Sequence, residues 1–201
     1  MRRGLFFVIL TMLMLSLVAC NEEDSKKVEA NTISSANLTE REEALLSGPT
    51  DQSFVFDFNA GDQYKEISVW VEKYESGKLV GKLNRMSTDI KNTGMMVFST
   101  AKVNEENNQS RFSISVHSDD ATSTAWSPET MKDDNFSTVS GSNTLDNISI
   151  KDKNIVLASI AYASSEEGPN GLTNDFYEDI DSHMNELKNY DVVYLLRCTF
   201  K

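Results

Sequence analysis

The sequence predicts a mainly β protein: an antiparallel β-sandwich with a short N-terminal helix and one late helix packed on the sheet. Two observations favour strands. Several short segments alternate apolar and polar residues, which is typical of a strand with one buried face. Polar turns separate these segments along the chain. A third observation limits the helices, because helical spacing is confined to two stretches. Short strands with few helices predict two packed sheets.

The first expected element is a short helix over residues 38–46. Thr39 and Glu42 have the spacing of a capping box. Gly48 and Pro49 follow and would end the helix. We expect its last apolar residues to dock on the strands that come next: Ala44, Leu45 and Leu46.

Alternation marks the strands in the first half of the chain. Three phenylalanines share one face of the segment 53–58. In the segment 65–74, apolar β-branched residues occupy one face, and Trp70 and Tyr74 lie on the other. Residues 75–78 form a tight turn that predicts a β-hairpin. The remaining strands are expected at 94–98, 111–117, 148–150, 155–163 and 190–200.

A late helix is expected after Gly171, capped at Thr173 or Asn174. One helical stripe gathers its apolar residues and one histidine: Phe176, Ile180, His183, Met184 and Leu187. The final strand then places Cys198 on an apolar face. Because this face is apolar and the only other cysteine is Cys20, near the start of the chain, we interpret Cys198 as a small core residue.

The beginning of the chain carries a targeting signal. Arg2 and Arg3 precede an apolar run that is too short to cross a bilayer. The run ends in Leu17-Val18-Ala19-Cys20, which resembles the lipobox of bacterial lipoproteins. That resemblance implies a diacylglycerol on Cys20, removal of residues 1–19, and a place outside the cytoplasmic membrane. Residues 20–37 then read as a polar flexible tether, and residues 38–201 as a single extracytoplasmic domain.

The charge restricts the partners of the chain. The formal net charge is −12, and the two arginines of the leader contribute positive charge that the mature chain would lack. Nucleic acid requires clustered Lys and Arg, so we expect no nucleic-acid partner. Anionic lipid headgroups would also repel the domain, so the acyl chains on Cys20 are the expected membrane contact.

No catalytic, cofactor-binding or metal-binding residue is assigned from the sequence. The chain has two histidines, His117 and His183, and His183 stands four residues after Asp179. Two ligands do not complete a zinc site, so a solvated helix face is the preferred interpretation. The acidic segments 131–135 and 175–181 lack the spacing of a calcium loop. No cofactor is expected.

Three aromatic residues are candidates for a recognition surface: Trp70, Tyr74 and Trp126. Trp70 and Tyr74 lie two pleats apart on one face of their strand, where exposed rings can bind a sugar or a peptide. The alternative is that a second layer, such as the late helix, covers them.

The segments 38–47 and 70–80 resemble small lipoproteins of Bacillus-type bacteria, a resemblance that carries no activity. We therefore expect a membrane-anchored extracytoplasmic lipoprotein with a non-enzymatic binding or structural role, whose partner is an envelope component or a protein. The first alternative is an immunity or accessory protein that binds one specific protein. The second is an envelope hydrolase whose site assembles only in space.

Overall fold

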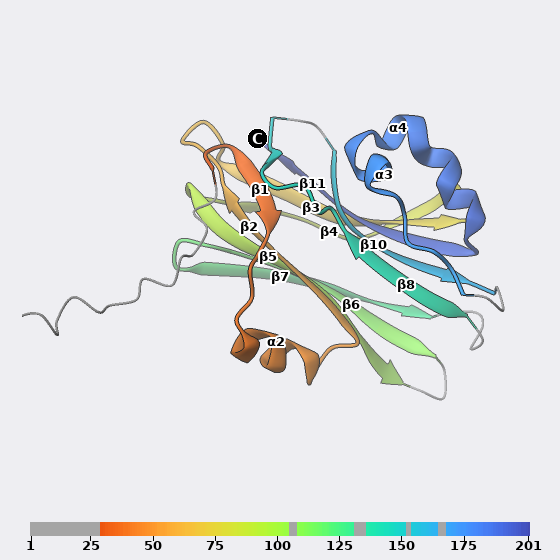
Figure 1. Cartoon of the computed structure of the whole chain (residues 1–201). Helices are drawn as coiled ribbons and strands as arrows, with labels where there is room; N and C mark the ends of the chain where they lie inside the picture. Colours follow the sequence, from red (N-terminus) through yellow and green to blue (C-terminus); the bar gives the residue numbers. More distant parts are fainter. Residues whose placement is uncertain (1–28, 105–107, 131–135, 152–153, 165–167) are drawn as a thin grey trace, which may run out of the picture.

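The computed structural model describes residues 29–104, 108–130, 136–151, 154–164 and 168–201, and it confirms the predicted antiparallel β-sandwich (Figure 1). Within these ranges, sheet A has six strands in the order β7-β6-β5-β2-β1-β9: β1 (Thr32–Ser35), β2 (Gln52–Asn59), β5 (Thr93–Asn104), β6 (Gln109–Ser118), β7 (Ala121–Thr130) and β9 (Ile148–Ser149). Sheet B, over the same ranges, has five strands in the order β4-β3-β11-β10-β8: β3 (Glu66–Glu75), β4 (Lys78–Asp89), β8 (Ser137–Ser142), β10 (Ile155–Ala163) and β11 (Val192–Phe200).

The main core lies between the two sheets. Alternation turns the phenylalanines of β2, β5 and β6 toward the apolar faces of β3 and β11. Phe112 of sheet A meets Tyr194 of sheet B with ring centroids 4.6 Å apart. Cys198 is fully buried in this core, as predicted, and burial raises the pKa of its thiol.

The predicted hairpin joins β3 to β4 through Ser76 and Gly77. Both residues have positive φ, 47° and 77° respectively. A two-residue type I′ turn requires left-handed backbone at both central positions, and glycine adopts it without strain. The turn sets the pairing of Glu75 with Lys78 and of Tyr74 with Leu79. A bulge in β4 just before Gly81 then shifts the register by one residue, and this shift places Glu72 of β3 beside Lys82 of β4.

A second, smaller core lies outside sheet B, under three short helices: α3 (Asn174–Glu178), α4 (Ile180–His183) and the 3₁₀ helix η1 (Met184–Asn189). The single late helix that the sequence predicts is therefore broken. The break is at Asp179, whose backbone leaves the helical region and whose carboxylate accepts a hydrogen bond from the Ser182 amide to cap α4. Thr173 caps α3, as predicted. Tyr177 of α3 is tied to β10 by a 2.7 Å hydrogen bond with Ser159.

The N-terminal helix α2 (Glu40–Ser47) lies on the other side of the sandwich, near β2 (Figure 1). Its predicted capping box is present: the Glu42 amide donates to the Thr39 hydroxyl, and the Thr39 amide donates to Glu42 at 2.8 Å. The expected docking of its apolar residues is wrong, because no residue of α2 is buried and Leu45 is 65% exposed.

The folded domain begins earlier than the sequence indicates. Residues 20–37 are predicted to be a tether, yet β1 occupies Thr32–Ser35 and pairs with β2 on one side and β9 on the other. Ile33 of β1 is fully buried in the main core. A strand this short and polar has no visible periodicity, and its partners stabilise it. The leader and Cys20 lie outside the described residues.

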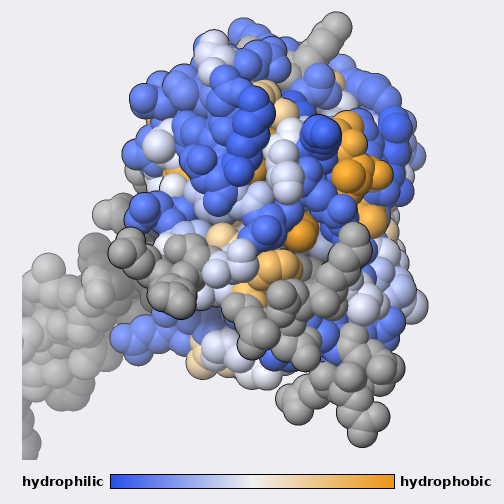
Figure 2. Space-filling model, turned by 90° about the vertical axis from the view of Figure 1, so that its right-hand side faces the viewer, coloured by the Kyte–Doolittle hydropathy of each residue, from blue (hydrophilic) through white to orange (hydrophobic). Residues whose placement is uncertain are grey.

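The surface is predominantly hydrophilic where Figure 2 views the molecule, from the right-hand side of Figure 1. Hydrophobic side chains gather there in small areas rather than in one broad patch. Within the described ranges, no helix has both the length and the apolar character needed to cross a membrane.

Candidate functional site

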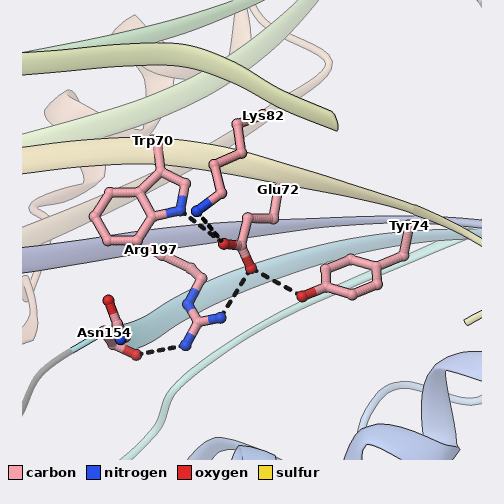
Figure 3. A network of polar contacts seen from close by, with 6 residues as sticks. All are labelled: Trp70, Glu72, Tyr74, Lys82, Asn154 and Arg197. Carbon is pink, nitrogen blue, oxygen red and sulfur yellow. Dashed lines mark hydrogen bonds and ion pairs between the residues drawn. The ribbon is translucent and has the colours of Figure 1, made fainter. Parts of the chain in front are cut away.

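The most strongly organised polar cluster lies on the outer face of sheet B, around the carboxylate of Glu72 (Figure 3). Oε1 of Glu72 accepts hydrogen bonds from Trp70 Nε1 and Lys82 Nζ, both at 3.0 Å. Oε2 accepts from the Tyr74 hydroxyl at 2.9 Å and from Arg197 Nη1 at 2.8 Å. Strand alternation on β3 brings these groups to one face, and β4 and β11 supply the two cations.

Charge pairing dominates the electrostatics of this Glu72 cluster. Burial alone would raise the pKa of Glu72, but the hydrogen bonds from Arg197 and Trp70 outweigh it and lower the pKa to about 2. Burial, together with the bond to Glu72, raises the pKa of Tyr74 to about 12. A carboxylate with so low a pKa is a poor general base, and a tyrosine with so high a pKa is a poor acid.

The Glu72 cluster is closed rather than open to a ligand. The side chain of Glu72 is 5% exposed, and both of its oxygens already accept two hydrogen bonds. Arg197 also donates from Nη2 to the Asn154 carbonyl at 2.9 Å, which fixes the start of β10 to β11. The arrangement braces three strands of sheet B, and its central carboxylate has both oxygens occupied.

The predicted recognition surface at Trp70 and Tyr74 is wrong. Both residues point away from the main core, as expected, but Trp70 is 6% exposed and Tyr74 is 4% exposed. Tyr74 is covered by the helical layer, the alternative that the sequence left open. Trp70 is covered by long polar side chains, with Lys82 Nζ 5.2 Å from its ring centroid.

Trp126 is the aromatic candidate that remains exposed. It lies on β7, an edge strand of sheet A, and 65% of its surface is accessible to solvent. The pairing register sets it directly opposite Ser113 of β6, on the face of sheet A that points away from the main core. This open face of sheet A is the only surface on which one of the three sequence candidates is available to a ligand.

The two histidines are not brought together with other reactive groups. His117 is exposed on the outer face of sheet A, where its Nδ1 is 2.9 Å from the Thr122 hydroxyl. His183 Nδ1 lies 2.9 Å from the backbone carbonyl of Asp179, while the Asp179 carboxylate caps α4 instead. Among the described residues, no group of three His, Cys, Asp or Glu side chains is placed to hold a metal ion.

The sequence did not identify the Glu72 cluster, although it contains a signal for it. Arg197 is a lone cation in an otherwise apolar strand, and a charge in such a position requires a partner. Glu72 shares one face of its strand with Trp70 and Tyr74, and it was a candidate for the anion that pairs with Arg197. Which anion pairs with Arg197 depends on the pairing of β3 with β11, which lie far apart in the chain.

Comparison with known proteins adds a family. A protein-family model described as YgaN domain matches residues 32–200. The match begins at the first residue of β1 and ends at the last residue of β11. No curated protein and no solved structure matches the chain at a significant level.

Proposed function

The chain belongs to the YgaN domain family, and we propose that this member is a lipoprotein held at the outer face of the cytoplasmic membrane by a diacylglycerol on Cys20. The observation that carries the proposal is the sequence Leu17-Val18-Ala19-Cys20 after a positively charged start and a short apolar run. Two acyl chains on one residue anchor a protein stably, whereas a single chain binds only marginally.

The spacing between Cys20 and the folded domain limits how far an anchor on Cys20 would let the domain move from the membrane. The main core begins at β1, so the segment from Cys20 to Thr32 spans at most about 40 Å even when it is fully extended. The sandwich would therefore stay close to the membrane. Its acidic composition gives no electrostatic attraction to anionic lipids, so the acyl chains provide the binding energy.

The proposed role of the domain is binding rather than catalysis. The carboxylate of Glu72 is fully occupied by hydrogen bonds. His117 lies on sheet A and His183 on helix α4, and they contact a threonine hydroxyl and a backbone carbonyl, respectively. By contrast, an exposed tryptophan on the outer face of a sheet is a feature that binding proteins use.

Metabolic labelling with a fatty acid tests the anchor. The wild-type chain should incorporate the label, remain in the membrane fraction after a high-salt wash, and dissolve in detergent. Cys20→Ala should lose the label and leave the membrane fraction.

Cys198→Ala is the matched control, because it removes the other cysteine of the chain and should keep both label and location. Labelled, membrane-bound Cys20→Ala protein would contradict the proposal.

A further inference from the structure

A row of small hydroxyl side chains crosses the outer face of sheet A from Trp126. The register pairs Trp126 with Ser113 of β6, Ser113 with Ser99 of β5, and Ser99 with Ser53 of β2. We call Ser53, Ser99 and Ser113 the serine row. All three are partly exposed, and their strand neighbours Phe98 and Phe112 point into the core instead. The four strands lie side by side in Figure 1.

A second row runs parallel to the first and is also uncharged. It consists of Val55, Val97, Ser115 and Thr124, of which Val55 is buried and the other three are partly or fully exposed. The hydroxyls of Ser115 and Thr124 are 2.9 Å apart, which leaves each of them able to make another hydrogen bond. The two rows together form a strip of apolar and hydroxyl side chains on the sheet surface, bordered on one side by Arg111.

The serine row ends in a hollow. Ser53 lines a cavity of about 370 Å³ between α2 and β2, together with Leu46, Ser47, Thr50 and the two acidic residues Glu43 and Asp51. The row from Trp126 to Ser53 crosses three gaps between strands, and neighbouring strands are about 4.8 Å apart. The strip is therefore about 15 Å long before it reaches the hollow, which is enough for an extended chain of several rings.

We propose that this strip binds an uncharged polysaccharide strand. The exposed indole of Trp126 offers a flat apolar surface on which a sugar ring stacks. The hydroxyls of the serine row can both donate to and accept from the hydroxyls of the sugar. Since the strip itself carries no charge and the chain is acidic overall, an anionic polymer is disfavoured.

The chemistry of the strip also separates a polysaccharide from a protein partner. Protein interfaces are centred on a cluster of apolar or arginine anchors in a fully desolvated pocket. Here the tryptophan stands beside serine hydroxyls, at one end of a strip rather than at its centre. The binding chemistry does not depend on Cys20, but access to envelope polysaccharide rests on the proposed place outside the membrane.

Titration of tryptophan fluorescence tests the proposal on the full-length chain in detergent. The probes are hexasaccharides of β-1,4-linked glucose and of β-1,4-linked N-acetylglucosamine, with polygalacturonate as the anionic comparison. At least one neutral hexasaccharide should bind and change the Trp126 emission, and polygalacturonate should not bind. Trp126→Ala should weaken binding at least about tenfold, because it removes the aromatic surface on which the sugar stacks. Calorimetry with the same hexasaccharide measures this loss.

Two further variants make the result specific. Ser113→Val should weaken binding severalfold, because it removes the hydroxyl next to the indole and leaves the size of the side chain similar. Leu79→Ala is the control: Leu79 is 50% exposed on β4 of the other sheet, and its removal should change nothing. Absence of binding to both neutral hexasaccharides overturns the proposal, and so does unchanged binding by Trp126→Ala. Neither result bears on lipidation, which the Cys20→Ala experiment measures separately.

Discussion

At the scale of single residues, Glu72 shows how a charged side chain can be only 5% exposed within this sandwich. Desolvation of a lone carboxylate would cost several kcal/mol, and the pKa of such a group would rise until it became neutral. Four donors reverse this balance, two of them cationic. The same donors need Glu72, because Arg197 is itself mostly buried. The members of the cluster therefore depend on one another. Removal of one member leaves its partners buried without a hydrogen bond or a counter-ion, which lowers the free energy of unfolding.

Glu72→Gln should lower the free energy of unfolding by about 3 kcal/mol at neutral pH, because it leaves Arg197 buried without its counter-ion. The pKa of Glu72 is lowered to about 2 from an ordinary value of 4.5. A lowered folded-state pKa adds stability above the unfolded pKa and loses it as the pH falls toward the folded pKa. Wild type should therefore lose about 3 kcal/mol as the pH falls from about 5 to about 2, and Glu72→Gln should lack this part of the pH dependence. Urea unfolding at a series of pH values measures both effects.

Glu66→Gln is the matched control for this experiment. Glu66 stands on the same strand and pairs with Lys201 at 3.1 Å, but both side chains are well exposed. An exposed pair contributes at most about 1 kcal/mol. Equal losses in the two variants would mean that the Glu72 cluster adds nothing beyond a surface ion pair.

At the scale of elements, some strands can be recognised from their own residues and others cannot. The hairpin β3–β4 and the strand β11 show a strand pattern in their own sequence, and the sequence predicts them correctly. β1, β7 and β8 do not, because their residues are mostly Ser, Thr and small side chains. β7 and β8 are edge strands, each with a neighbour on one side, and β7 tolerates Pro128 for that reason. Such strands form because a partner strand supplies hydrogen bonds, even where that partner is the preceding strand, as β6 is for β7.

The same reason limits what the sequence says about the candidate site. Alternation correctly turned Trp70 and Tyr74 away from the main core. It could not show that helices cover Tyr74, or that Lys82 covers Trp70. The serine row is likewise invisible in the sequence, because Ser53, Ser99 and Ser113 become neighbours only through the register of three strands.

Ile33→Ala tests whether β1 belongs to the folded domain. Ile33 is fully buried opposite Phe58, so truncation should lower the free energy of unfolding by about 3 kcal/mol. Ser34→Ala on the opposite face of the same strand should stay within about 0.5 kcal/mol of wild type. Urea unfolding of both variants decides the matter. A tether, as the sequence predicts for residues 20–37, would leave both variants unchanged.

At the scale of the whole molecule, stability is concentrated in the middle layer of the structure. β11 pairs on both sides and packs against both cores, so most of its residues are buried. α2 represents the opposite case, since it buries no residue and contacts little beyond β2. The two elements are therefore the extremes of local stability. β11 opens only when the whole domain unfolds, whereas α2 opens alone at a much lower free energy. The hollow that ends the serine row lies at the weakly held α2.

Hydrogen exchange followed by mass spectrometry should show this difference directly. Peptides from β11 should exchange only through global unfolding, whereas peptides from α2 should exchange far sooner. Thr39→Ala removes the capping hydroxyl and should weaken α2 by about 1 kcal/mol, which is roughly a fivefold faster exchange in that helix. Because α2 opens independently, the same variant should leave exchange in β11 and the urea midpoint unchanged. If Thr39→Ala accelerated β11 as well, α2 would be part of the cooperative unit, and the hollow beside it would be as rigid as the sandwich itself.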